Sequence, residues 1–179
     1  MIHSVYEAGA ISPLVLGSED GTSLSVCQFT TGRDAHRHDW NSAERSDDAP
    51  AFSQARSWLD RYFAGKAPDP AELTLAPQGT AFQHAVWNAL LAIPYGQTAT
   101  YGWVAQRVGE ARGTKTSARA VGGAVGANPI GIIVPCHRVV GAQGSLTGFG
   151  GGIETKIALL RHEGVDLSHL SVPAGGTAL

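Results

Sequence analysis

The chain has 179 residues and lacks the features that mark membrane and secreted proteins. No stretch approaches the roughly 18 consecutive apolar residues of a membrane-spanning helix, and the N-terminus lacks a charged segment followed by an apolar one. We therefore expect no membrane span, no secretory signal and a cytoplasmic protein. Only two cysteines occur, Cys27 and Cys136, and a reducing compartment would keep both as thiols, so no disulfide is predicted.

Charge is scarce as well, at 16% of residues, and the net charge of −2 argues against a nonspecific polycation. The distribution of charge along the chain is uneven. Residues 1–78 carry eleven acidic and six basic side chains, whereas residues 101–138 carry five basic side chains against Glu110 alone. Because phosphates attract clustered lysine and arginine, residues 101–138 are the part of the chain that could face a nucleic acid.

Metal-ligand spacing is also missing. Cys27 is accompanied only by scattered histidines, and solvated loop histidines are commoner than metal ligands, so neither a metal nor another cofactor is predicted. The histidines considered are His3, His36, His38 and His84.

The most informative stretch places Cys136 beside His137 at the end of an apolar run. Residues 130–134 are too few for a helix and too apolar for a surface loop, so they predict a buried, strand-like segment that Pro135 ends. A buried cysteine is most often inert packing, but a neighbouring base and the charge of Arg138 favour a thiolate. Adjacent residues of an extended segment point to opposite faces, so either a bridging water or a sharp turn is needed to join Cys136 to His137.

A hydrophobic content of 43% suits one globular core or two small domains. Residues 14–16 and 24–29 predict a β-hairpin, and apolar spacing predicts a helix from Pro50 that ends near Gly65. A strand is also possible at residues 73–75. With a linker at residues 76–79, we predict an α/β N-terminal domain over residues 1–78, made of a small antiparallel sheet and a helix.

The C-terminal domain, residues 79–165, is predicted to be mainly helical. Helices are expected to follow Thr80 and Thr100, the second ending at Gly109, and to span about residues 116–126 and 154–163. The second and third of these, with basic residues between them, suggest a DNA-binding helix-turn-helix. Residues 166–179 are expected to form a disordered tail.

Glycines crowd the predicted helix at residues 116–126. Each interior glycine costs about 1 kcal/mol relative to alanine, so the small size of Gly122, Gly123 and Gly126 must be required. Close packing is the simplest explanation. The alternative is a face of small residues, with Ala118, Gly122 and Val125 among them, that could enter a narrow groove.

These residues together resemble the O6-alkylguanine-DNA alkyltransferase family. The resemblance extends from about residue 80 to about residue 164, and it rests on six motifs in family order. They are Ile93-Pro94-Tyr95-Gly96, Thr100-Tyr101-Gly102, Ala118-Arg119-Ala120-Val121-Gly122, Asn128-Pro129 with Pro135-Cys136-His137-Arg138-Val139-Val140, Leu146-Thr147-Gly148-Phe149-Gly150-Gly151 and His162-Glu163-Gly164.

The resemblance implies a ribonuclease-H-like N-terminal domain and a suicide reaction, in which Cys136 takes the alkyl group from O6-alkylguanine in DNA and keeps it. Glu163 would orient His137, and His137 would deprotonate a water that takes the proton of Cys136. Asn128 would order the turn that carries the cysteine, and Tyr101 would donate a proton to guanine. The substrate pocket implied consists of Tyr101, Pro135, Val139, Phe149, Gly150 and Gly151, with Phe149 where many members have Tyr.

The implied partner is double-stranded DNA, bound through the minor groove by a monomer with the lesion base flipped out. Arg119 would fill the place of the flipped nucleotide, with Ala118, Gly122 and Tyr101 also contacting DNA. Two alternatives are a noncatalytic lesion-binding protein and a cysteine hydrolase, the latter requiring direct contact between Cys136 and His137 and an oxyanion hole. The sequence leaves the preferred alkyl group and activity on O4-alkylthymine open.

Overall fold

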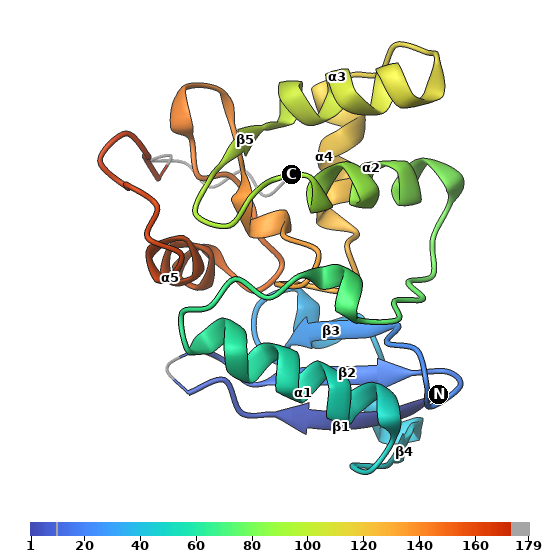
Figure 1. Cartoon of the computed structure of the whole chain (residues 1–179). Helices are drawn as coiled ribbons and strands as arrows, with labels where there is room; N and C mark the ends of the chain where they lie inside the picture. The colour runs from blue at the N-terminus through green and yellow to red at the C-terminus, as the bar shows by residue number, and fades with distance from the viewer. Residues whose placement is uncertain (10, 173–179) are drawn as a thin grey trace. The chain divides into compact units, whose positions relative to one another are not determined.

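A computed structural model describes residues 1–9 and 11–172, and these form two compact units (Figure 1). The first comprises residues 1–78 together with residues 129–133, and the second comprises residues 79–128 and the chain from residue 134 onward. The segment 129–133 joins the first unit because the Cys27 amide donates to the Pro129 carbonyl at 2.9 Å and the Gly131 amide donates to the Cys27 carbonyl at 2.7 Å. The sequence pattern alone places this segment in the C-terminal domain.

The first unit is built on a four-stranded sheet in the order β3-β2-β1-β4. The strands are β1 (Ile2–Tyr6), β2 (Leu14–Ser18), β3 (Val26–Phe29) and β4 (Glu44–Arg45). The pairs β1–β2 and β2–β3 are antiparallel, but β4 runs parallel to β1, so the sheet is mixed and the prediction of an antiparallel sheet is wrong at this edge. The long connection of residues 30–43 lets β4 run in the same direction as β1.

Helix α1 (Pro50–Phe63) packs on this sheet, as predicted (Figure 1). Proline suits the first turn, where no helical partner exists for its missing N–H. The helix buries Phe52, Ala55, Leu59 and Tyr62, and the Tyr6 hydroxyl of β1 donates to Asp60 at 2.8 Å. The predicted strand at residues 73–75 is present only as a bridge between Leu75 and Leu24.

The second unit is mainly helical, as predicted. Its helices are α2 (Ala81–Leu91), α3 (Tyr101–Arg112), α4 (Ala118–Gly126) and α5 (Ile153–His162), and β5 (Ala99–Thr100) pairs in parallel with β6 (Val139–Val140). Helices α2, α3 and α4 pack on one another. Thr80, Thr100 and Ser117 cap α2, α3 and α4 through their side-chain oxygens, because those oxygens satisfy amides that lack helical partners.

The predicted end of the helix that follows Thr100 is wrong by three residues. Helix α3 continues past Gly109 to Arg112, and Gly113 ends it with a left-handed φ of 65°. Gly109 leaves room for the chain that follows the helix, because a Cβ there would lie 3.0 Å from the Thr114 carbonyl oxygen. The glycine thus permits a tight turn between α3 and α4.

The apolar run at residues 130–134 is buried as predicted, but it is not a strand. The Ile133 amide donates to the Gly131 carbonyl across Ile132, whose φ of 68° is rare for a β-branched residue. A second tight turn follows at Pro135, where the Cys136 amide donates to the Val134 carbonyl at 2.8 Å. Hydropathy is the same for a buried strand and for buried turns, so the sequence pattern could not separate them.

The expected disordered tail is partly wrong. Residues 173–179 lie outside the described residues, but residues 166–172 make defined contacts. The Ser171 amide donates to the Gly144 carbonyl at 3.1 Å, and the Leu146 amide donates to the Ser171 carbonyl at 2.8 Å. Leu167 and Leu170 pack against the buried cluster of Val140, Leu146 and Leu160, so apolar contact holds this segment. In the described part of the chain, no helix has the length and hydrophobicity to cross a bilayer.

Candidate active site

Cys136 opens a 3₁₀ turn, η4 (Cys136–Arg138), immediately after Pro135. Its thiol is only partly exposed, and it lies beside Asn128, which follows the C-terminal end of α4. The Asn128 side-chain amide donates to Sγ of Cys136 at 3.1 Å and to the Val134 carbonyl at 2.9 Å. One side chain therefore holds the turn and directs a hydrogen-bond donor at the sulfur, which favours the thiolate.

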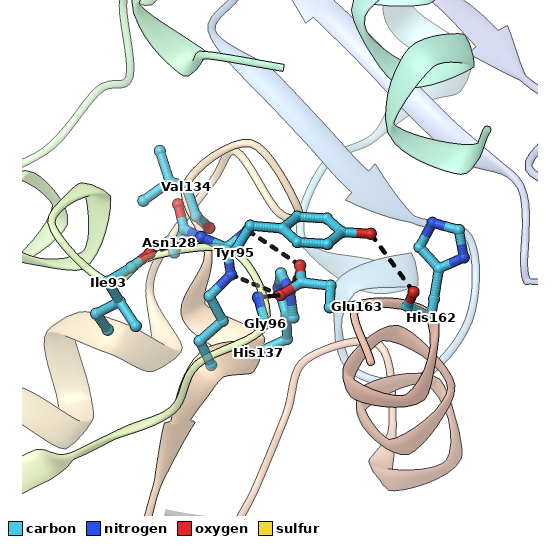
Figure 2. Close-up of polar contacts among 9 residues, drawn as sticks. Ile93, Tyr95, Gly96, Asn128, Val134, His137, His162 and Glu163 are labelled. Atoms are coloured by element: carbon cyan, nitrogen blue, oxygen red, sulfur yellow. Dashed lines mark hydrogen bonds and ion pairs between the residues drawn. The ribbon is translucent and has the colours of Figure 1, made fainter. Parts of the chain in front are cut away.

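His137 is completely buried, and its two ring nitrogens have different surroundings. Nε2 lies 2.7 Å from Oε1 of Glu163 (Figure 2), whereas Nδ1 has no hydrogen-bond partner among the described residues. An ionised carboxylate accepts hydrogen bonds only, so Nε2 carries the proton and the lone pair is on Nδ1. A buried base nitrogen in this position is suited to hydrogen-bond a water and to accept its proton.

Glu163 stands at the C-terminal end of α5, and four donors satisfy its buried carboxylate. They are Nε2 of His137 at 2.7 Å, Nε and Nη2 of Arg138 at 2.8 and 3.0 Å, and the Gly96 amide at 3.2 Å. Burial alone would raise the pKa of Glu163, but the hydrogen bonds from His137 and Arg138 and the charge of Arg138 outweigh burial and hold this pKa well below its usual range. Glu163 is therefore ionised.

Burial is the main influence on His137 and lowers its pKa. Glu163 opposes that shift, while the positive charges of Arg138 and Lys156 add to it. The net lowering means that His137 is neutral near pH 7 and can act as a base.

Sequence reasoning did not assign two buried cations, Arg138 and Lys156, to this site. Arg138 pairs with Glu163 as described, and Lys156 of α5 donates from Nζ to the Val139 and Thr147 carbonyls at 2.6 and 3.0 Å. Burial lowers the pKa of Lys156 from 10.5 to about 8. A lysine spaced among the apolar residues of a helix was the signal that could have found it.

Of the predicted pocket residues, Pro135 and Val139 flank the cysteine turn directly. Val139 is buried and pairs with Ala99, and this short ladder fixes the start of α3, where Tyr101 stands, relative to the cysteine turn. The Thr147 hydroxyl lies 3.5 Å from the Tyr101 hydroxyl. Phe149 and Gly150 are partly exposed in the loop that precedes α5, and Gly151 is buried there.

Helix α4 places the predicted DNA-contacting residues on two different sides. Ala118 and Arg119 are exposed in its first turn, but Gly122 and Val125 are buried, so those two do not belong to an exposed small-residue face. Gly123 is the exposed glycine, and a Cβ there would meet nothing within 4 Å. Packing within the described chain therefore does not explain Gly123.

The chain is similar to proteins of a known family. Residues 81–165 match the family model described as 6-O-methylguanine DNA methyltransferase, DNA binding domain. The methylated-DNA–protein-cysteine methyltransferase of Mycobacterium tuberculosis H37Rv is 45% identical over 163 residues, which are 91% of this chain and 93% of that protein. This chain belongs to the methylated-DNA–protein-cysteine methyltransferase family.

Other members of the family support the assignment. The Haemophilus influenzae methylated-DNA–protein-cysteine methyltransferase is 41% identical and covers 90% of this chain and 86% of its own length. The crystal structure of Mycobacterium tuberculosis OGT in complex with DNA has a TM-score of 0.78 and 42% identity to this methyltransferase, covering 92% of this chain and 93% of its own. The mixed sheet and helices described above therefore form this family's fold.

Proposed function

We propose that this methyltransferase repairs DNA directly, by transferring the alkyl group of O6-alkylguanine irreversibly to its own Cys136. The observation that carries the proposal is the arrangement of the thiol and its base. Cys136 accepts a hydrogen bond from Asn128, and Glu163 holds Nε2 of the adjacent His137 while Nδ1 has no partner among the described residues. Family membership supports this reaction in preference to a cysteine hydrolase.

In the proposed reaction, a water bound at Nδ1 of His137 takes the proton of Cys136 and passes its own proton to His137. The thiolate attacks the alkyl carbon, so an S–C bond forms while the C–O6 bond breaks. The electron pair of the broken bond moves into the guanine, which takes a proton from Tyr101. The hydroxyl of Tyr101 is then restored from protonated His137 through solvent, and the thioether remains on the protein.

Asn128 and Glu163 have supporting roles in this scheme. The Asn128 amide favours the thiolate by donating to sulfur, and the charge of Glu163 stabilises the His137 imidazolium that forms transiently. No second nucleophile is assigned to release the alkyl group from a thioether, so each molecule is consumed by one turnover.

DNA is proposed to bind through α3 and α4 acting as a helix-turn-helix, with α4 in the minor groove. Support comes from the exposed small residues Ala118 and Gly123 and from exposed Arg119, which would occupy the space of the flipped base. A lesion stacked in a duplex cannot reach a half-buried thiol, so flipping is required. We further propose that the first unit is ribonuclease-H-like, that residues 79–165 form the catalytic and DNA-binding domain, and that a monomer acts.

The proposal is tested with Cys136→Ala and a duplex that carries one O6-methylguanine. The variant should bind this duplex with the affinity of the wild type and remove no methyl group. Residual transfer by Cys136→Ala would contradict the assignment of the nucleophile. Lesion binding without transfer by the wild-type protein would instead favour a noncatalytic lesion-binding protein.

A further inference from the structure

The Arg138 side chain, in the cysteine turn, donates three hydrogen bonds. Its guanidinium forms two hydrogen bonds with Glu163, and Nη1 donates to the Ile93 carbonyl at 2.6 Å. It also lies over the ring of Tyr95, with 5.7 Å between the guanidinium carbon and the ring centroid. An arginine fork of this kind fixes a carboxylate in both position and plane.

Arg138 and His137 are consecutive residues that donate to one carboxylate. Oε1 of Glu163 accepts hydrogen bonds from Nε2 of His137 and Nη2 of Arg138. Oε2 accepts hydrogen bonds from Nε of Arg138 and from the Gly96 amide. Each carboxylate oxygen thus accepts hydrogen bonds from two donors, and Arg138 supplies one of the two at both oxygens. With His137 neutral, the charges of Arg138 and Glu163 cancel within the buried cluster.

We propose that Arg138 is a positioning residue for alkyl transfer: it fixes Glu163 and balances its charge, so that His137 rests in the neutral form that can accept the proton of Cys136. Without the arginine, a buried and unbalanced carboxylate would hold His137 as an imidazolium. An imidazolium has no lone pair on Nδ1 and cannot serve the relay. The inference rests on the proposed role of His137 as the base.

The other charges around His137 do not replace this function. Glu163 and Lys156 come from α5, Cys136 shares the turn η4, and Tyr95 comes from the connection between α2 and β5. Lys156 is positive, but its Nζ is committed to the Val139 and Thr147 carbonyls and not to Glu163. Arg138 also acts in the required direction, because its charge lowers the pKa of His137.

Arg138→Gln and Arg138→Lys test the proposal, with exposed Arg161→Gln on α5 as a matched control. The first measurement is the ring-carbon NMR titration of His137, made in a Cys136→Ala background so that the thiol does not titrate. We expect Arg138→Gln to move the His137 titration upward by about one pH unit or more. Arg138→Lys and the control should leave its midpoint in place.

The second measurement is the rate of methyl transfer from the O6-methylguanine duplex against pH, with Cys136 present. In Arg138→Gln the acidic limb should move upward with His137, so that a shift of one pH unit lowers the rate about tenfold on that limb and less at pH 9. Arg138→Lys should be slower at every pH with an unmoved limb, because it keeps the charge and loses the fork. That variant keeps the test decisive if Arg138→Gln does not fold.

Equal slowing at all pH values in Arg138→Gln, with an unchanged His137 titration, would overturn the proposal and leave Arg138 a structural residue. A shifted limb in Arg138→Lys would also overturn it. Failure of the underlying relay has a different signature, namely full transfer activity in His137→Ala. In that case the NMR titration would still report what Arg138 does to His137.

Discussion

Replacing Glu163 with glutamine removes one negative charge from a buried site without a large change in volume. Both oxygens of Glu163 accept hydrogen bonds, from His137 and Arg138 at Oε1 and from Arg138 and the Gly96 amide at Oε2. A glutamine must place its NH2 group against one of these two sets. Either orientation sets donor against donor and leaves the Arg138 cation unbalanced.

The magnitude of the effect follows from these contacts. Removing one partner of a buried ion pair costs about 3–5 kcal/mol, so the free energy of unfolding should fall by about that amount. Transfer should slow as well, because the His137 imidazolium loses a charge-assisted hydrogen bond that contributes about 1.5–3 kcal/mol. That loss corresponds to a rate of alkyl transfer about 10- to 200-fold lower.

The assay is single-turnover methyl transfer from an O6-methylguanine duplex, with urea unfolding of the same preparations. Glu154→Gln is the matched control, since Glu154 is exposed on the first turn of the same helix. It should leave the transfer rate unchanged and lower the free energy of unfolding by no more than about 1 kcal/mol, through the helix dipole. A folded Glu163→Gln protein that transfers at the wild-type rate would refute the reasoning, because the carboxylate would then be structural only.

Three further predictions follow from the same structure. Arg119→Ala should slow repair of duplex DNA about 10- to 100-fold, because flipping the base costs a few kcal/mol, and should affect repair of single-stranded substrate little. Arg161→Ala is the control, and equal losses on both substrates would contradict the insertion of Arg119 into the duplex. Gly123→Leu should raise the free energy of unfolding by up to about 1 kcal/mol, because the new side chain enters open space, yet weaken duplex binding; unchanged affinity would remove α4 from the DNA interface. For Lys156 the unfolded chain binds the proton more tightly than the folded protein between pH 8 and 10.5, the ordinary pKa of a lysine, so wild-type stability should rise with pH there. Lys156→Met should lose that rise. Between pH 7 and 9.5, the free energy of unfolding measured in urea should increase by about 1–2 kcal/mol more in the wild type than in Lys156→Met. Parallel pH profiles of the two proteins would contradict a lowered pKa.

The features that the sequence predicted well are those whose physical cause is local. A threonine before an apolar periodic run satisfies free amides whatever surrounds it, so the sequence predicts helices that follow Thr80 and Thr100, and both threonines cap them. An inward carboxylate at a helix C-terminus is unfavourable alone, so the position of Glu163 in the sequence predicts a cation or a donor beside it. The structure supplies His137 and, in addition, Arg138.

The features that it missed depend on contacts between distant segments. Neighbouring glycines on a helix point about 100° apart, and only the packing of α4 decides that Gly122 is buried while Gly123 is exposed. The parallel pairing of β4 and the joining of residues 129–133 to the first unit are likewise absent from local pattern. The sequence indicates the charge of Arg138 but not its pairing with Glu163, because that pairing depends on the turn η4, which brings the guanidinium to the distant carboxylate.

Intact-mass spectrometry after incubation with an O6-methylguanine duplex, followed by peptide mapping, tests the central claim most directly. The account predicts a gain of one methyl group per protein molecule, located on the peptide that contains Cys136. An unchanged mass despite lesion binding would contradict alkyl transfer, and a methyl group on Cys27 would contradict the assignment of the nucleophile.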